Sequence, residues 1–173
     1  NFHAPFKYSK MELKLLKNLV KWIKFCIFVC CIYDKKERWA MVKKRILYVS
    51  QEITPYLPEN DLSKTSRFLP QAMNESGIDV RLFMPRFGCI NERRHQLHEV
   101  IRLSGMNLIV NDIDQPLIIK VASIPQARMQ VYFIDNEEYF KRKFTTEDKK
   151  GDFYSDNDER ALFFCRGVIE SVK

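Results

Sequence analysis

The sequence predicts an α/β domain of three layers, with helices on both faces of a largely parallel sheet. Residues 46–49 (ILYV) form an unbroken apolar run, which is typical of a central strand buried on both faces. Residues 61–76 carry apolar side chains three and four positions apart, and Gly77 then suits the left-handed end of a helix. Residues 80–84 resume a strand. Strand, helix and strand within about 40 residues make a βαβ unit, whose first loop is where such sheets bind ligands.

The middle of the chain predicts a β-hairpin beside the parallel strands. After a polar loop, strand-like runs cover residues 100–103, 106–110, 117–124 and 129–134. The polar turn at residues 112–115 is too short for a crossover helix, so the runs on its two sides are expected to pair antiparallel. The predicted sheet is therefore mixed.

The carboxyl-terminal part predicts two helices around a polar loop. Asp135 and Asn136 either turn the chain into a helix at residues 137–143, since aspartate is a good N-cap, or face a ligand at the carboxyl edge of the sheet. Asp156 can cap the last helix, with Glu159 as its capping-box partner. The apolar stripe of that helix consists of Ala161, Phe164, Cys165, Val168, Ile169 and Val172. Cys165 is therefore expected in the core.

The composition supports one domain and argues against nucleic-acid binding. The chain has 173 residues, of which 46% are hydrophobic, and this is enough for a single domain with a core. Its net charge of +7 is concentrated at the start: residues 1–40 hold nine basic against three acidic side chains, whereas residues 41–173 hold 20 against 19. The nearly neutral body has no basic stripe with interleaved aromatic residues, so we expect no nucleic-acid partner.

Residues 1–40 are a basic leader that we expect to lie outside the fold, which then comprises residues 41–173. The leader places apolar residues between lysines at helical steps, and its apolar run at residues 25–33 is too short to span a bilayer. It has the basic start of a secretory signal but lacks small residues for cleavage, and an interfacial amphipathic helix is a further alternative. We adopt the interpretation that translation begins at Met41.

The cysteines and histidines indicate neither a metal site nor a disulfide framework. Three of the five cysteines lie in the leader, and Cys89 and Cys165 are far apart with no CxxC spacing. His95 and His98 have the spacing of two ligands on one helical turn, but no third ligand is evident. Reduced thiols are the rule in the cytoplasm, where we expect the protein to be located.

Several short motifs follow one another between Val49 and Phe164. They are VSQEITPYL (49–57), LPQA (69–72), GIDVR (77–81), MPRFG (84–88), YFIDN (132–136), EYF (138–140) and DNDERALFF (156–164). In this order they resemble the amino-terminal end of bacterial glycogen synthases and plant starch synthases, over about residues 43–173. The resemblance implies a Rossmann-like three-layer sandwich, the amino-terminal half of a GT-B glycosyltransferase with a β-hairpin insertion. A second half of roughly 150 to 250 residues is then missing from this chain.

The activity that the resemblance implies is transfer of glucose from ADP-glucose, or UDP-glucose in some members, to the non-reducing end of an α-1,4-glucan with retention of configuration. The nucleotide sugar and the glucan are then the partners, and no cofactor is needed. Because the donor-clamping basic residues of the family belong mainly to the carboxyl-terminal half, residues 41–173 alone are expected to be inactive. The alternative is a non-catalytic module that binds glucan or a partner.

The resemblance also assigns candidate site residues. Asp156, Asn157 and Arg160, in the D-N-x-x-R motif, are the candidate catalytic residues, because this motif borders the cleft where glucan and sugar donor meet in the family. The family usually has phenylalanine after the arginine, where this chain has Ala161. The substrate-binding candidates are Glu52, Pro58, Asp61, Asp135 and Asn136.

The first loop departs from the family pattern. Where the family usually has Lys-x-Gly-Gly-Leu, this chain has PENDL at residues 58–62, so only the leucine matches. A carboxylate in place of a glycine repels a diphosphate, and the missing lysine removes a phosphate contact. Either this chain holds its donor differently, or the loop does not hold phosphate.

Overall fold

The computed structural model describes residues 28–31, 45–124 and 127–173. Its strands are β1 (Phe28–Cys31), β2 (Arg45–Val49), β3 (Asp79–Pro85), β4 (His98–Glu99), β5 (Met106–Val110), β6 (Ile113–Ile124) and β7 (Met129–Asp135). Its helices are α2 (Asp61–Glu75), α3 (Glu137–Phe140) and α4 (Asn157–Val172).

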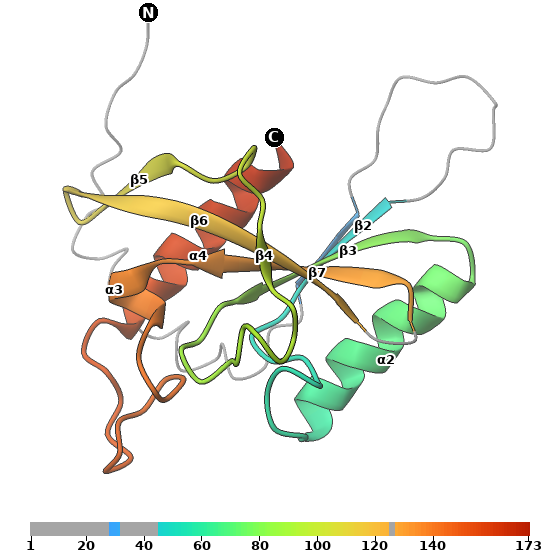
Figure 1. Ribbon diagram of the computed structural model, residues 1–173, viewed down its shortest axis with the longest axis horizontal. Coiled ribbons are helices and arrows are strands. Elements are labelled where there is room, and N and C mark those ends of the chain that lie inside the picture. Colours follow the sequence, from blue (N-terminus) through green and yellow to red (C-terminus); the bar gives the residue numbers. More distant parts are fainter. Residues whose placement is uncertain (1–27, 32–44, 125–126) are drawn as a thin grey trace, which may run out of the picture.

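Within the described residues, the strands form one seven-stranded sheet in the order β1-β2-β3-β7-β6-β4, with β5 paired to β6 (Figure 1). β2, β3 and β7 run parallel, and β6 pairs antiparallel with β7. β5 and β6 form a hairpin that turns at Asn111 and Asp112, with φ of 52° and 62°. The predicted βαβ unit, mixed sheet and hairpin are thus confirmed.

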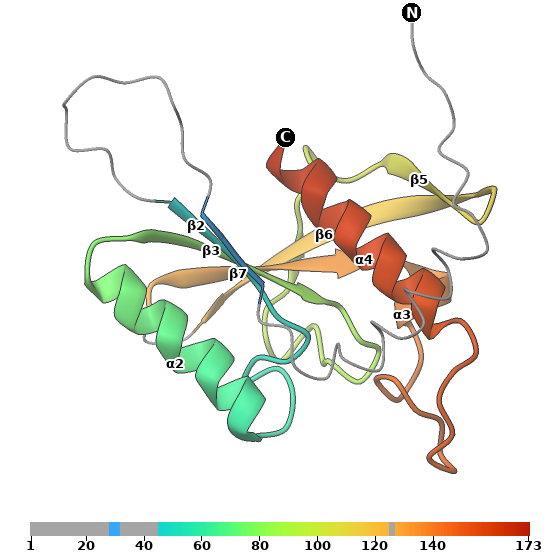
Figure 2. The same cartoon turned by 180° about the vertical axis from the view of Figure 1, so that it is seen from behind.

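The sheet is covered on both faces. Phe133 and Ile134 are neighbours on β7, so their side chains point to opposite faces. The Phe133 ring packs 4.9 Å from that of Tyr56, in the loop that leads into α2. The Ile134 face lies against α4, which crosses in front of β6 and β7 in Figure 2 and behind them in Figure 1. The predicted three-layer α/β fold is confirmed. The helices cover the faces of the sheet, and several candidate site residues lie near the carboxyl ends of its parallel strands.

β2 occupies the predicted position of the first strand but is less buried than the apolar run predicts. Tyr48 is fully buried, whereas Ile46, Leu47 and Val49 are only partly buried. β2 has strand neighbours on both sides, with β3 parallel to it and β1 antiparallel. An unbroken apolar run therefore predicted the strand correctly and overestimated its burial.

β1 belongs to the leader that the sequence places outside the fold. Its pairing with β2 differs from the expectation that residues 1–40 make no contact with the domain. The physical reason is that the outer edge of β2 presents unpaired N–H and C=O groups, which a further strand can satisfy. The rest of the leader and Met41 lie outside the described residues, so the domain boundary remains a prediction.

Two predicted elements differ from the structure. Residues 100–103 form turns rather than a strand, with Ile101 84% exposed, and the strand that pairs with β6 is β4 just before them. The helix predicted at residues 137–143 ends at Phe140, because Arg142 beyond it is drawn into an ion pair with Asp156.

α4 buries a different face from the predicted apolar stripe. Its buried residues are Arg160, Phe163, Gly167 and Val168, whereas Cys165 is exposed, so the expectation that Cys165 is a core residue is wrong. A β-carbon at Gly167 would lie 2.9 Å from Ile134 Cγ2 and 3.1 Å from Leu117 Cδ1. The missing side chain at Gly167 thus lets the helix approach the sheet closely, and this contact selects the buried face.

Candidate functional site

The candidate residues fall into three groups. Glu52 and Pro58 lie in the loop that follows β2, and Asp61 is the first residue of α2. Asp135 and Asn136 lie at the carboxyl end of β7. The third group is the D-N-x-x-R motif at the start of α4.

The first group closes the amino end of α2 with side chains of the chain itself. Asn60 accepts a hydrogen bond from Ser63 N at 2.7 Å, and Ser63 Oγ accepts one from Asn60 N at 2.9 Å, which makes a capping box. Ser63 Oγ also donates to the Pro58 carbonyl at 3.1 Å, and the Asn60 amide donates to the Glu52 carboxylate. Asp61 is exposed in the first turn of the helix.

These contacts place the Glu52 carboxylate beside the cap of α2, and the nearby cation Lys64 is paired with Glu59. Of the backbone N–H groups that a diphosphate would need at a helix amino end, that of Ser63 is already capped by Asn60. Glu52 adds a negative charge on the outer side of that cap. The geometry agrees with the departure of the PENDL segment from the family pattern, since the cap and the Glu52 carboxylate both disfavour an anion at this end of α2.

Asp135 lies in a network of four charged side chains. Lys120 Nζ on β6 is 2.9 Å from Asp135 Oδ2 and 2.8 Å from Glu92 Oε1. Arg86, just after β3, pairs with Glu92 and lies with its Nε 3.7 Å from Asp135 Oδ2. Only 7% of the Asp135 side chain is exposed. Two cations and two anions balance one another here, at the carboxyl ends of β3 and β7.

The network shifts the protonation equilibria of its members. Burial raises the pKa of Glu92, but the hydrogen bonds from Lys120 and Arg86 outweigh it and hold the pKa below its ordinary value. Burial lowers the pKa of Lys120, but its bonds to Asp135 and Glu92 raise the pKa above the ordinary value. The ion pair between Lys120 and Glu92 is therefore favoured in its charged form.

Asn136, not Asp135, caps α3. Its Oδ1 accepts hydrogen bonds from Glu138 N and Tyr139 N, each at 3.0 Å. Its amide donates to Gln115 Oε1 at 3.1 Å and to the Pro116 carbonyl at 3.0 Å, so the fully buried side chain ties α3 to β6. The predicted turn into a helix is correct, but the capping residue is the second of the two candidates.

Asp156 makes no side-chain cap bond to α4, in contrast to the capping box that the sequence predicts. Its two carboxylate oxygens instead accept from Arg142, Oδ1 from Nη1 at 2.6 Å and Oδ2 from Nη2 at 2.5 Å. Its expected partner Glu159 accepts from Tyr139 Oη at 3.1 Å and from Asn111 Nδ2 at 3.2 Å. The ion pair with Arg142 is the stronger interaction for a carboxylate and displaces the cap.

Arg160 is a buried arginine whose donors are used inside the protein. Its side chain donates to the Tyr139 carbonyl and the Thr145 carbonyl at 2.7 Å each, and to Asn157 Oδ1 at 2.6 Å. The rings of Phe87, Phe140 and Tyr154 lie 5.3 to 5.8 Å from its guanidinium carbon. Burial lowers the pKa of Arg160 to about 10. Arg160 thus holds α3 and the following loop against α4.

Asn157 completes this arrangement. It donates to the Thr146 carbonyl at 2.8 Å while its Oδ1 accepts from Arg160. The structure therefore brings the three candidate catalytic residues together. Among them, Asn157 and Arg160 anchor the loop of residues 141–155, and Asp156 carries the partly exposed carboxylate.

The sequence analysis did not identify the charged partners of Asp135 and Asp156, which are Lys120 and Arg142. Lys120 had a usable signal, because it is the one charged residue in the apolar run LIIKVASI of residues 117–124. A cation inside a buried strand indicates a carboxylate partner nearby. Arg142 had no such signal, since it stands in the polar run KRK with nothing to distinguish it from its neighbours.

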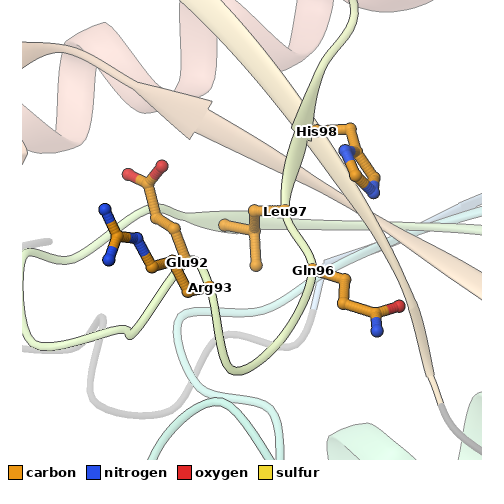
Figure 3. A pocket seen from close by; sticks show the side chains of 5 residues that line it. All are labelled: Glu92, Arg93, Gln96, Leu97 and His98. Carbon is orange, nitrogen blue, oxygen red and sulfur yellow. The ribbon is translucent and has the colours of Figure 1, made fainter.

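A hollow of about 510 Å³ lies beside the Glu92 network (Figure 3). It is lined by Glu92, Arg93, Gln96, Leu97 and His98. In Figure 3 the Glu92 and Arg93 side chains point to one side of the loop, and those of Gln96 and His98 to the other. None of the candidate residues from the sequence lines this hollow. In the part of the chain that the structure describes, no group of three or more His, Cys, Asp or Glu side chains could hold a metal ion.

No helix among the described residues is long and apolar enough to cross a membrane.

Comparison with known proteins defines the class of this domain. The model of the starch synthase catalytic domain matches residues 45–173. The chain is 38% identical to a glycogen synthase of Chlorobium limicola over 131 residues, which are 75% of this chain and 27% of that protein. It is also 38% identical to a glycogen synthase of Chlorobaculum tepidum over 129 residues, 74% of this chain and 26% of that protein.

A solved structure has the same fold. The catalytic domain of starch synthase IV from Arabidopsis thaliana, bound to ADP and acarbose, superposes with a TM-score of 0.59 at 17% identity, over 72% of this chain and 24% of that one. Fold and sequence together define the class as an α/β domain of the kind that forms the amino-terminal half of a GT-B fold. The chain belongs to the starch synthase catalytic domain family, and it spans about a quarter of the length of the relatives it matches.

Proposed function

We propose that this chain supplies part of the amino-terminal half of a glycogen synthase. The complete enzyme transfers glucose from ADP-glucose or UDP-glucose to the non-reducing end of an α-1,4-glucan, with retention of configuration, in the cytoplasm. The nucleotide sugar is a substrate, so the reaction needs no cofactor. The proposal is supported by the relatives, which are glycogen synthases, and by the related fold that binds ADP and acarbose.

The observation that carries the proposal is the state of Asp156. Its carboxylate is released from helix capping, is held in a fork by Arg142, and keeps 25% of its side chain exposed. Glycosyl transfer develops positive charge on the sugar, which a nearby fixed carboxylate stabilises. We assign this role to Asp156, while Asn157 and Arg160 position the loop that borders it.

The capped amino end of α2 affects how the diphosphate of the sugar donor is bound. With Asn60 as cap and Glu52 beside it, this loop offers no cation to the diphosphate. The leaving diphosphate then depends on cations from the carboxyl-terminal half of the enzyme. In this proposal Glu52, Pro58 and Asp61 shape the cleft floor, and Asp135 and Asn136 support it.

The same loop favours a second candidate function. A domain that lacks the usual lysine and glycines could bind glucan without turnover. The two candidates differ in whether a nucleotide sugar is consumed.

The test is to express the complete gene product and the 173-residue chain, and to measure glucose incorporation into glycogen from ADP-glucose and from UDP-glucose. We expect turnover with at least one donor for the complete protein and none for the 173-residue chain, which lacks the donor-clamping half. A complete protein that binds maltoheptaose but incorporates glucose from neither donor would support the non-catalytic candidate instead.

The site assignment is tested by Asp156→Ala in the complete protein. We expect turnover to fall roughly 100-fold or more. The loss of unfolding free energy should stay near 1 kcal/mol, as for a partly exposed ion pair. Asp158→Ala, two positions further along α4, is the control and should keep its turnover. If Asp156→Ala is less stable yet equally active per folded molecule, Asp156 is structural and the assignment fails.

A further inference from the structure

Arg142 contacts both oxygens of the Asp156 carboxylate. Both terminal nitrogens of its guanidinium donate, one to each carboxylate oxygen, at 2.6 and 2.5 Å. Such a fork fixes both the distance and the plane of the carboxylate, which a single point charge cannot do.

Arg142 is itself fixed from two sides. Its guanidinium carbon lies 4.6 Å from the centre of the Tyr154 ring, within the range of a cation–π contact. Its backbone lies directly against Gly88: a β-carbon there would lie 2.3 Å from the Lys141 carbonyl oxygen and 2.4 Å from that of Arg142. The ring and the close backbone approach restrict where the fork can point.

The Asp156 carboxylate is held in place and still has free hydrogen-bond acceptor sites. Each oxygen of a carboxylate has two lone-pair sites, and the fork occupies one on each oxygen. The side chains of Asp156 and Arg142 remain 25% and 32% exposed. A free acceptor site on a fixed, accessible carboxylate is what contact with a sugar requires.

We propose that Arg142 is a positioning residue for glucosyl transfer, which sets the orientation of the Asp156 carboxylate toward the sugar, with Tyr154 and Gly88 setting the orientation of Arg142. This inference rests on the proposed function. A displacement of about 1 Å at a reacting group can cost about 100-fold in rate, so loss of the fork should act on turnover.

The charge state of the pair is consistent with this role. Burial raises the pKa of Asp156, but the hydrogen bonds and charge of Arg142, with a smaller contribution from Arg160, outweigh it and hold the pKa below its ordinary value. The bond to Asp156 raises the pKa of Arg142. Both partners therefore stay charged at neutral pH.

The test compares Arg142→Lys and Arg142→Gln in the complete protein. Lysine keeps the charge and loses the fork. We expect kcat to fall about 10-fold for Arg142→Lys and about 100-fold for Arg142→Gln, with KM for donor and glucan changed less than twofold. The matched control is Lys141→Gln, which removes the exposed pair with Glu137 on the adjacent position and should keep its kcat.

Three other outcomes would contradict the proposed role of Arg142. If Arg142→Lys keeps full kcat, fork geometry is irrelevant and the inference is wrong. If KM rises while kcat is kept, Arg142 binds substrate directly and does not act through Asp156. If the wild-type complete protein transfers glucose from neither donor, the proposed function fails and this role fails with it.

A second measurement does not depend on activity. In the 173-residue chain, the Asp156 carboxyl group can be titrated by carbon-13 NMR. We expect its titration midpoint to move to higher pH in Arg142→Gln, with a smaller move in Arg142→Lys and none in Lys141→Gln. An unchanged midpoint in Arg142→Gln would show that the pair does not hold the carboxylate in solution. Should Arg142→Gln fail to fold, Arg142→Lys carries the same comparison.

Discussion

Lys120 Nζ lies 2.9 Å from Asp135 Oδ2, across the antiparallel pairing of β6 and β7. Lys120 stands in an apolar run and is partly buried, and its charge offsets that of the buried Asp135 at the end of the last parallel strand. Glu92 and Arg86 complete the network from the loop after β3. At the carboxyl edge of the sheet, charge pairing thus stands beside the apolar packing of Met84 and Ile134.

Lys120→Met should destabilise the domain by about 3 kcal/mol, because it leaves the carboxylates of Asp135 and Glu92 with one cation between them in a partly buried site. Urea unfolding at pH 7 measures the loss. Lys64→Met is the control, since the Lys64 pair with Glu59 is exposed and should contribute within about 0.5 kcal/mol. Equal stabilities for the two variants would mean that the network contributes nothing.

Asn60→Ala should cost about 1 kcal/mol of unfolding free energy, because the Ser63 N–H loses its acceptor. Asn60→Ser keeps a capping oxygen and should be within a few tenths of a kcal/mol of the wild type. Thermal unfolding of both variants makes the comparison. If Asn60→Ala and Asn60→Ser lower the unfolding free energy equally, Asn60 does not stabilise the domain as a helix cap.

Tyr56→Phe should leave stability at pH 7 unchanged or raise it by up to about 1 kcal/mol. The Tyr56 hydroxyl is buried and has no hydrogen-bond partner among the described residues, so its removal leaves no donor unpaired. A loss above about 1 kcal/mol would reveal a hydrogen bond that the structure does not contain.

The same variant has a distinct effect at alkaline pH. Burial raises the pKa of Tyr56 from 10.0 to about 12, against a smaller lowering by the charge of Arg67. The folded state therefore keeps the proton more tightly than the unfolded state. That contribution to stability is fully present below pH 10.0 and is lost as the pH rises through about 12. Tyr56→Phe should lose less stability than the wild type over this range, while Tyr139, whose pKa is also raised to about 12, ionises in both.

Gly88→Ala should cost about 1 to 3 kcal/mol, because the new β-carbon would overlap the backbone carbonyls of Lys141 and Arg142. Backbone amide chemical shifts at residues 141–143 should move as that loop is pushed away. Gly77→Ala serves as the control. Its β-carbon meets no atom within 4 Å, so it should lower the unfolding free energy only because alanine disfavours the φ of 85° at this position. If Gly88→Ala leaves the 141–143 amides unchanged, the close approach does not fix Arg142.

Much of the fold could be predicted from local pattern. The apolar run before Ser50, the helix that ends at Gly77 and the second strand predicted the βαβ unit, because burial on two faces and helical periodicity are properties of neighbouring residues. The polar turn at residues 112–115 predicted the hairpin for the same reason. The ordered motifs indicated the family, which the match over residues 45–173 shows.

The site depended on contacts between segments, which local pattern does not report. At Asp156 the sequence offered a capping box with Glu159, and the structure instead pairs Asp156 with Arg142 and Glu159 with Tyr139. A charge-assisted fork is stronger than a cap, but it is available only when the loop after α3 folds back onto α4.

The sequence by itself determined the βαβ unit, the hairpin and the family, since hydrophobic periodicity and short motifs are written along the chain. Only the tertiary structure decided which cation pairs with Asp156, which asparagine caps a helix and which face of α4 is buried. At Gly167 the face was set by how closely the helix backbone approaches Ile134, and at Asp156 by which cation lies within reach. Both depend on distances between residues far apart in the chain, and these distances exist only after the layers have packed.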